Sequence, residues 1–184
     1  MRAGVLVLGP LLAKYRTAKV SLPGGCAIGS RPINFHLEAL KKMGAKIKIK
    51  DGYIFASAKK GLKGCAIKFP KISVGATENV LIAASFSKGD TKLRNCAIEP
   101  EINDLISFLK KIGCKIKKIG KRGINISGVK ELKPAIHKVI FDRIEAGTYV
   151  IATALTKGRL KIKNINPKIM LAEMLSLKKM GVNI

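Results

Sequence analysis

Leu40-Lys41-Lys42-Met43-Gly44 is a short stretch that occurs three times in this sequence. It returns as Leu109-Lys110-Lys111-Ile112-Gly113 and as Leu177-Lys178-Lys179-Met180-Gly181, with glycines 69 and then 68 residues apart. Counting back from each glycine, positions one, four, seven and eleven are apolar in all three copies, which is the spacing of one helix face. Glycine after such a stripe favours the left-handed conformation that ends helices, and lysines in the last turn complement the negative helix end. The sequence therefore predicts helices over residues 33–43, 102–112 and 170–180.

Shorter elements surround each of these helices in the same order. An alternating run that predicts a half-buried strand follows each glycine, at 45–49, 114–119 and 182–184. A short strand is expected before each striped helix, at 18–20, 91–93 and 159–161, and an apolar helix of small residues before that, at 2–8, 78–86 and 145–155. A further strand and turn precede the last two of these helices, at 67–77 and 139–144. The pattern is an α/β fold of repeated βαβαββ units, which cannot cover their apolar faces alone and must pack on one another.

The repeat begins and ends inside a unit. The first copy starts at its helix with Met1, and the third stops in its strand at Ile184. We therefore expect a chain that is truncated at both ends relative to a longer repeat protein.

One loop departs from the repeat. The second and third copies take 22 residues from the short strand to the marker glycine, whereas the first takes 26. The surplus lies in residues 22–32, LPGGCAIGSRP. Such a glycine-rich loop is commonly a plain connection, but scaffold residues repeat and functional residues need not. A thiol in a loop near cations can have a lowered pKa, so Cys26 is a candidate nucleophile or acid.

The charge balance raises the question of an anionic partner. Lys and Arg number 36 against 11 Asp and Glu, a net charge of +25, which is typical of nucleic-acid-binding proteins. Most of these cations are lysines that alternate with isoleucine along the whole chain, and there is no Trp. No interleaving of basic and aromatic residues is visible along the sequence. We therefore regard nucleic acid as an unlikely partner, and a basic nucleic-acid-binding protein as an alternative reading.

Cysteine spacing and hydropathy restrict the class of protein further. The four cysteines are widely spaced and neither histidine lies in ligand spacing to them, so no metal site or disulfide framework is predicted. The apolar N-terminus mimics a signal peptide, but Gly9-Pro10 interrupts it and no cleavage pattern follows. No apolar run approaches the ~20 residues of a membrane span. We expect a cytoplasmic protein with no membrane partner and no cofactor.

The loop of residues 22–32 resembles the catalytic-loop signature of the UDP-N-acetylglucosamine enolpyruvyl transferases. Other segments resemble the same family in the same order: 1–3 (MRA), 8–11 (LGPL), 73–79 (SVGATEN), 99–102 (EPEI) and 142–148 (DRIEAGT). The family's fold is a pair of inside-out α/β barrels of three such units each, in agreement with the repeat. The resemblance implies that residues 1–140 belong to the loop-bearing domain and that residues 141–184 begin the second.

The resemblance also implies an enzyme. The family transfers the enolpyruvyl group of phosphoenolpyruvate to the 3′-hydroxyl of UDP-N-acetylglucosamine with release of phosphate, the first committed step of peptidoglycan synthesis. Cys26 matches the cysteine that donates a proton, forms an adduct with phosphoenolpyruvate and reacts with fosfomycin. The positions matching the substrate site are Arg2, Arg31, Pro32, Ile33, Asn34, Phe35, Lys71, Ile72, Ser73 and Val74. Guanidinium and ammonium groups suit two polyanionic substrates.

Some positions depart from the family's pattern. Asn34 and Phe35 replace the usual aspartate and leucine, which puts uridine contacts there in doubt. Arg16, Ile98 and Phe141 replace a common glycine, arginine and proline.

The family's N-terminal Lys-Asn pair, its later catalytic aspartate and the arginines that grip phosphoenolpyruvate lie outside this sequence. An inactive remnant is therefore a second alternative, and the remainder of the enzyme is a candidate partner. The shikimate-pathway enolpyruvyl transferase shares the architecture but has no loop cysteine, so Cys26 argues against it.

Overall fold

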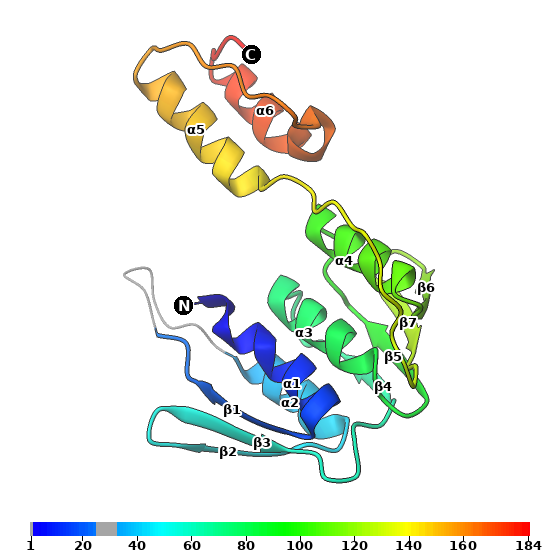
Figure 1. Ribbon diagram of the computed structural model, residues 1–184. Coiled ribbons are helices and arrows are strands. Elements are labelled where there is room, and N and C mark those ends of the chain that lie inside the picture. The colour runs from blue at the N-terminus through cyan, green and yellow to red at the C-terminus, as the bar shows by residue number, and fades with distance from the viewer. Residues whose placement is uncertain (1, 25–32) are drawn as a thin grey trace. The chain divides into compact units, whose positions relative to one another are not determined.

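The computed structural model describes residues 2–24 and 33–184, apart from the side chains of Arg2 and Ala3. The chain divides into two compact units, Met1–His137 and Lys138–Ile184. The elements of the first unit (Figure 1) are η1 (Arg2–Val7), α1 (Leu8–Tyr15), β1 (Thr17–Ser21), α2 (Asn34–Lys42), β2 (Lys46–Lys50), β3 (Tyr53–Ser57), β4 (Ala66–Lys68), α3 (Val74–Ala84), β5 (Asp90–Arg94), α4 (Pro100–Lys111), β6 (Lys115–Ile119) and β7 (Gly123–Ser127). Those of the second unit are α5 (Arg143–Leu155), η2 (Pro167–Met170) and α6 (Leu171–Lys179).

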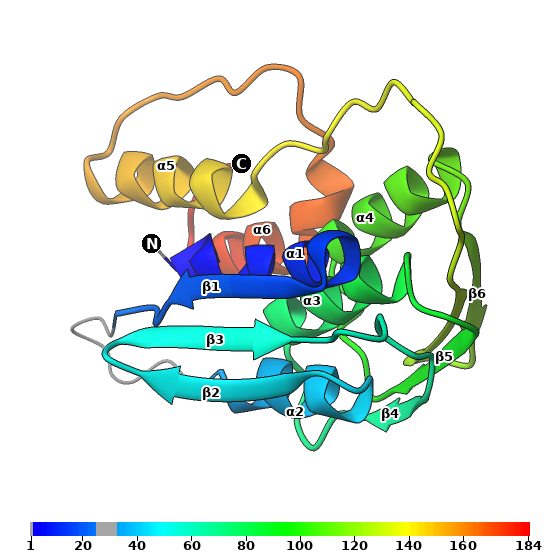
Figure 2. The same ribbon diagram turned by 60° about the horizontal axis from the view of Figure 1, so that its bottom comes forward.

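Each of the first two sequence repeats builds a sheet. In the first sheet, β3 lies between β1 and β2 and is antiparallel to both (Figure 2). The second sheet has the order β4-β5-β7-β6, in which only β4 and β5 run parallel. The triplets β1-β3-β2 and β5-β7-β6 thus have the same order and directions. The structure confirms the repeat that the spacing predicts.

Helices occupy the interior of the first unit. The central helix is α3, which packs against η1, α1, α2 and α4. It is buried on several sides through small and apolar residues such as Ala76, Val80 and Ala84, as expected for a helix without a polar face. The sheets turn one face inward and one outward, so that Ile54 of β3 is buried while Phe55 is exposed. This inside-out α/β arrangement is the predicted fold class.

The apolar stripes form the predicted helices. All four stripe positions are buried in the first two copies, and Gly44, Gly113 and Gly181 have φ values of 97°, 107° and 88°. After α2, the Gly44 amide donates to the Lys41 carbonyl and the Ala45 amide to the Leu40 carbonyl, at 2.8 and 3.0 Å. Glycine therefore closes each helix in the left-handed conformation, as predicted.

The first two small-residue helices differ from the prediction, the first at its C-terminal end and the second at its N-terminal end. The first is a 3-10 helix to Val7 that continues as the α-helix α1 to Tyr15, beyond the predicted end at residue 8. Pro10 does not stop it, because Pro10 lies in the first turn, where backbone N–H groups have no partner within the helix. The second, α3, begins at Val74 rather than residue 78, because the Ser73 side chain caps it by accepting from the Ala76 amide.

The third copy lacks the predicted strands. Residues 139–144, 159–161 and 182–184 form no strand. A strand needs a partner, and residues 138–184 contain no equivalent of β3 or β7 with which 159–161 could pair. The helical prediction does hold for α5 and α6, whose backbone hydrogen bonds are internal to each helix.

The second unit has a small core. Asp142 caps α5 by accepting from the amides of Ile144 and Glu145 at 2.8 and 3.0 Å. Its buried apolar residues are Ala146 and Met170, whereas Leu155 is 80% exposed and the stripe residue Met180 is 77% exposed. The apolar faces of this unit are therefore largely uncovered within it. In the part of the chain that the structure describes, every helix is too short or too polar to cross a bilayer.

Candidate functional site

The described part of the predicted substrate site comes from the starts of two packed helices. Ile33 is buried just before α2, Asn34 is exposed and Phe35 is half-buried in its first turn. Residues 71–74 run into α3, with Lys71 and Ile72 exposed and Ser73 and Val74 half-buried. Both segments lie in the first unit, where they lead into two helices, α2 and α3, that pack against each other. Cys26, Arg31 and Pro32 lie outside the described residues, as does the side chain of Arg2.

One buried side chain, Asn79 on α3, ties these helices together. Its Oδ1 accepts from the Gly9 amide at 2.8 Å. Its Nδ2 donates to the Val5 carbonyl at 3.0 Å and lies 3.0 Å from Nδ1 of His36. Asn79 therefore bonds to η1, α1 and α2 at once, and the element that begins with Arg2 is held against the two site-bearing helices.

His36 lies in the first turn of α2 and is 7% exposed. Burial lowers the pKa of its imidazole from 6.5 to about 4, so the ring is neutral at pH 7. Since the Gly9 amide fixes Asn79 with its NH₂ group toward His36, the Nδ1 of His36 is the acceptor and its proton sits on Nε2. A Cβ at Gly75 would lie 3.6 Å from this Nε2, so the ring edge faces the first turn of α3.

The start of α3 is also anchored to the segment that follows β5. The Thr77 hydroxyl donates to the Ser73 carbonyl at 2.8 Å and accepts from the Ala97 amide at 3.1 Å. The first amides of a helix are unpaired within it and carry partial positive charge. With the Lys71 side chain exposed just before it, this helix start is suited to an anionic group.

The other cysteines are poor nucleophiles. Burial raises the pKa of the Cys96 thiol from 9.0 to about 11, and burial also raises the pKa values of Cys65 and Cys114. All three are free thiols. Cys96 and Cys114 are core residues and Cys65 packs against the core, and the thiolate fractions of all three at neutral pH are low.

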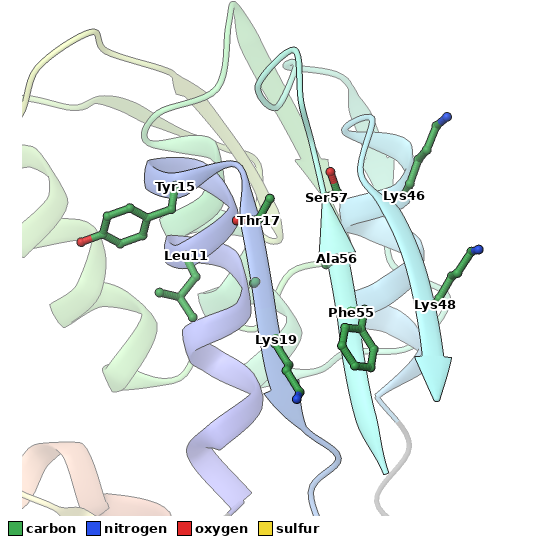
Figure 3. Close-up of a pocket in the computed structure, with 10 residues that line it drawn as sticks. Leu11, Tyr15, Thr17, Lys19, Lys46, Lys48, Phe55, Ala56 and Ser57 are labelled. Atoms are coloured by element: carbon green, nitrogen blue, oxygen red, sulfur yellow. The ribbon is translucent and has the colours of Figure 1, made fainter. Parts of the chain in front are cut away.

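A separate hollow of about 640 Å³ lies on the outer side of the β1-β3-β2 sheet and contains none of the predicted site residues (Figure 3). In register across the strands, Phe55 lies between Lys19 and Lys48. The Lys19 ammonium lies 4.5 Å from the ring centroid of Tyr53 and 5.4 Å from that of Phe55. Basic and aromatic residues are thus neighbours across strands, which the linear sequence did not reveal.

Sequence reasoning missed Asn79 and His36 as organising residues. Asn79 was part of a segment matched to the family, but nothing in that segment pointed to contacts with residues 70 or more positions away. The one available signal was a polar residue directly before the apolar run that starts with Val80 and Leu81, in the predicted helix 78–86. A buried amide requires partners, but the sequence does not say which.

The chain matches known proteins over its full length. Residues 1–184 match the family described as EPSP synthase (3-phosphoshikimate 1-carboxyvinyltransferase). The UDP-N-acetylglucosamine 1-carboxyvinyltransferase of Pelagibacter ubique (strain HTCC1062) is 62% identical over 184 residues, and that of Endomicrobium trichonymphae is 51% identical. The match covers all of this chain and 44% of either relative, so the chain spans less than half of their length.

Solved structures share the fold. The enolpyruvyl transferase NikO from Streptomyces tendae has a TM-score of 0.67 at 22% identity, covering 81% of this chain and 36% of NikO. EPSP synthase from Acinetobacter baumannii has a TM-score of 0.63 at 20% identity, covering 84% of this chain and 35% of that one. The predicted fold and the predicted resemblance are both confirmed. The chain belongs to the enolpyruvyl transferase family described as EPSP synthase (3-phosphoshikimate 1-carboxyvinyltransferase), within which its relatives are named UDP-N-acetylglucosamine 1-carboxyvinyltransferase.

Proposed function

We propose that this chain is the loop-bearing part of a UDP-N-acetylglucosamine 1-carboxyvinyltransferase. The observation that supports this most is the identity of 50–62% to relatives of that name over the whole chain. In the proposed reaction the sugar 3′-hydroxyl adds to C2 of phosphoenolpyruvate while C3 gains a proton. The hydroxyl proton leaves during this addition, and loss of phosphate from C2 together with a proton from C3 then restores the double bond and gives the enolpyruvyl ether.

Each predicted site residue has a role in this proposal. Cys26 delivers the proton to C3, while Arg2 and Arg31 compensate substrate charge. The nucleotide lies along Arg31, Pro32, Ile33, Asn34 and Phe35 on one side and Lys71, Ile72, Ser73 and Val74 on the other. Two features support this: these two segments lead into α2 and α3, which pack together, and the start of α3 is suited to the diphosphate.

The domain assignment follows the same proposal. Residues 1–140 form the loop-bearing domain and residues 141–184 begin the second. The division of the structure after His137 and the cap on α5 at Asp142 support a boundary in this region. The remainder of the enzyme, on this or another chain, is the proposed partner. A cytoplasmic location and a contribution to cell wall biogenesis, cell shape and cell division are part of the proposal.

Nuclear magnetic resonance titration of the chain with UDP-N-acetylglucosamine tests the substrate assignment. We expect the backbone amides of residues 33–35 and 73–75 to shift, and shikimate 3-phosphate to leave them unchanged. Shifts confined to the outer face of β1 and β3 would overturn the site. Shifts with shikimate 3-phosphate alone would instead identify the related shikimate-pathway enzyme.

Thiol mapping tests the role of Cys26. Under limiting iodoacetamide, label should appear at Cys26 before the other three cysteines, whose pKa values are raised by burial. A Cys26→Ser variant serves as the control and should lose the fast phase. Faster labelling at Cys65, the least buried of the three, would contradict the assignment. Iodoacetamide is preferable to fosfomycin, because fosfomycin labelling requires a substrate site closed by the rest of the enzyme.

A further inference from the structure

Asn79 uses its whole side-chain amide to join distant parts of the chain. The residue is fully buried, and its three contacts reach Val5, Gly9 and His36. All three bonds run between elements, since their partners lie 43 to 74 residues away in sequence. A side chain that only filled space would not need three matched polar partners.

The orientation of this amide decides the state of the His36 ring. The Gly9 N–H requires an acceptor, so Oδ1 of Asn79 faces Gly9 and Nδ2 faces Val5 and His36. An NH₂ group opposite Nδ1 allows only an unprotonated Nδ1, and burial disfavours the imidazolium. The ring is left neutral with its proton on Nε2.

The protonated edge of His36 faces the candidate site. Among the residues that the structure describes, Nε2 has no hydrogen-bond partner, and its neighbour is Gly75 in the first turn of α3. A Cβ at Gly75 would lie 3.3 Å from Cε1 of the ring, tighter than an ordinary contact. Gly75 therefore leaves room beside the ring.

We propose that Asn79 is a positioning residue of the nucleotide-sugar site: it fixes His36 as the Nε2–H tautomer facing the first turn of α3 and holds η1, α1 and α2 in register with α3. The proposal rests on the proposed function for the identity of the ligand. In this proposal Asn79 does not touch the reacting atoms but acts through His36 and through the starts of α2 and α3.

Nitrogen-15 spectra of the histidine rings in the full chain test the first half of the proposal. The wild type should show the Nε2–H tautomer at His36. Asn79→Asp keeps the acceptor for Gly9 but offers oxygen to Nδ1, so His36 should become protonated on Nδ1. An Nδ1–H tautomer in the wild type, or an unchanged ring in a folded Asn79→Asp variant, would overturn the proposal.

Titration with UDP-N-acetylglucosamine tests the second half. Asn79→Asp should weaken binding about tenfold or more, because His36 then no longer presents its Nε2–H donor toward the anionic ligand. This is the loss expected when one charge-assisted hydrogen bond is misplaced. Ser87→Ala is the matched control, because Ser87 is buried after the opposite end of α3 and donates to the Ala84 carbonyl at 3.0 Å. It should lower stability without changing affinity, and an equal loss of affinity in both variants would refute a positioning role.

Two substitutions of His36 keep the test valid if Asn79→Asp does not fold. The amide of His36→Gln can accept from Asn79 and donate outward, so it should retain most of the affinity, whereas His36→Leu should lose it. Equal affinities for the two variants would count against the proposal. If the wild-type chain does not bind UDP-N-acetylglucosamine at all, the proposed function fails, while the histidine spectra still decide whether Asn79 sets the ring.

Discussion

Arg16 ends α1 with φ 62° and ψ 0°, a left-handed conformation in which its Cβ is strained. Its amide still donates to the Leu12 carbonyl at 3.0 Å, as a helix-ending residue should. Arg16→Gly is therefore expected to raise the free energy of unfolding by about 0.5–1 kcal/mol. Urea unfolding measures this, with Lys14→Gly inside the same helix as a control that should lose about 1 kcal/mol. A less stable Arg16→Gly variant would show that the arginine side chain contributes more than the strain costs.

His36 makes stability depend on pH in the acid range. Its pKa is about 4 in the folded chain and 6.5 without burial, so the unfolded chain binds the extra proton between these values. The contribution is fully present above pH 6.5 and is lost as pH falls toward 4; it amounts to about 3 kcal/mol. Between pH 7 and 4.5, wild type should lose about 2–3 kcal/mol more than His36→Gln in urea unfolding. Parallel losses in the two proteins would mean that His36 is not neutral in the fold.

The contact of α1 with α3 depends on Gly9. A Cβ at Gly9 would lie 2.2 Å from Oδ1 and 2.5 Å from the backbone oxygen of Asn79, and α3 cannot yield there without breaking the Asn79 bonds. Gly9→Ala should thus destabilise the first unit by about 2–4 kcal/mol, through overpacking and lost hydrogen bonds. Gly4→Ala is the matched control, since a Cβ there meets nothing within 4 Å. Thermal unfolding of both variants checks the prediction, and a well-folded, stable Gly9→Ala protein would contradict the close approach.

The outer face of the β1-β3-β2 sheet offers a test of nucleic-acid binding. Lys19 already lies over the rings of Tyr53 and Phe55, so we expect retention on single-stranded DNA to be electrostatic and to fall steeply with salt. Phe55→Ala should leave the eluting salt concentration unchanged, whereas Lys19→Ala combined with Lys48→Ala should lower it. A clear loss with Phe55→Ala would indicate base stacking and favour the nucleic-acid reading.

The helices were more predictable than the strands. An apolar stripe and a terminal glycine are local signals, and they located α2, α4 and α6 within a few residues. Strands depend on a partner: the run at 159–161 has the same local character as β5 but nothing in residues 138–184 to pair with. The start of α3 was missed because it depends on the Ser73 cap, and the contacts of Asn79 because they depend on how four helices pack.

At the scale of the whole molecule, the two units differ in how completely they bury their apolar faces. The first unit has a continuous core drawn from both repeats. The second leaves Ile144, Tyr149 and Leu155 more than half exposed, since two helices offer too few layers to cover one another. The sequence repeat predicted that a βαβαββ unit cannot cover its apolar faces alone. The resemblance supplied the expected domain boundary near residue 140. That boundary stays a proposal, supported by the division after His137.

The chain's own activity is the remaining prediction at this scale. The 184 residues span 44% of the Pelagibacter relative, and the resemblance puts the catalytic aspartate and the arginines that grip phosphoenolpyruvate outside them. Each such orienting or electrostatic group can contribute ~10²–10⁴ in rate, so the chain alone should release phosphate only at background. A phosphate-release assay with both substrates measures this, with Cys26→Ser as the blank and a full-length relative as the positive control. Turnover above about 1 s⁻¹ that disappears in Cys26→Ser would show that these 184 residues carry a complete active site.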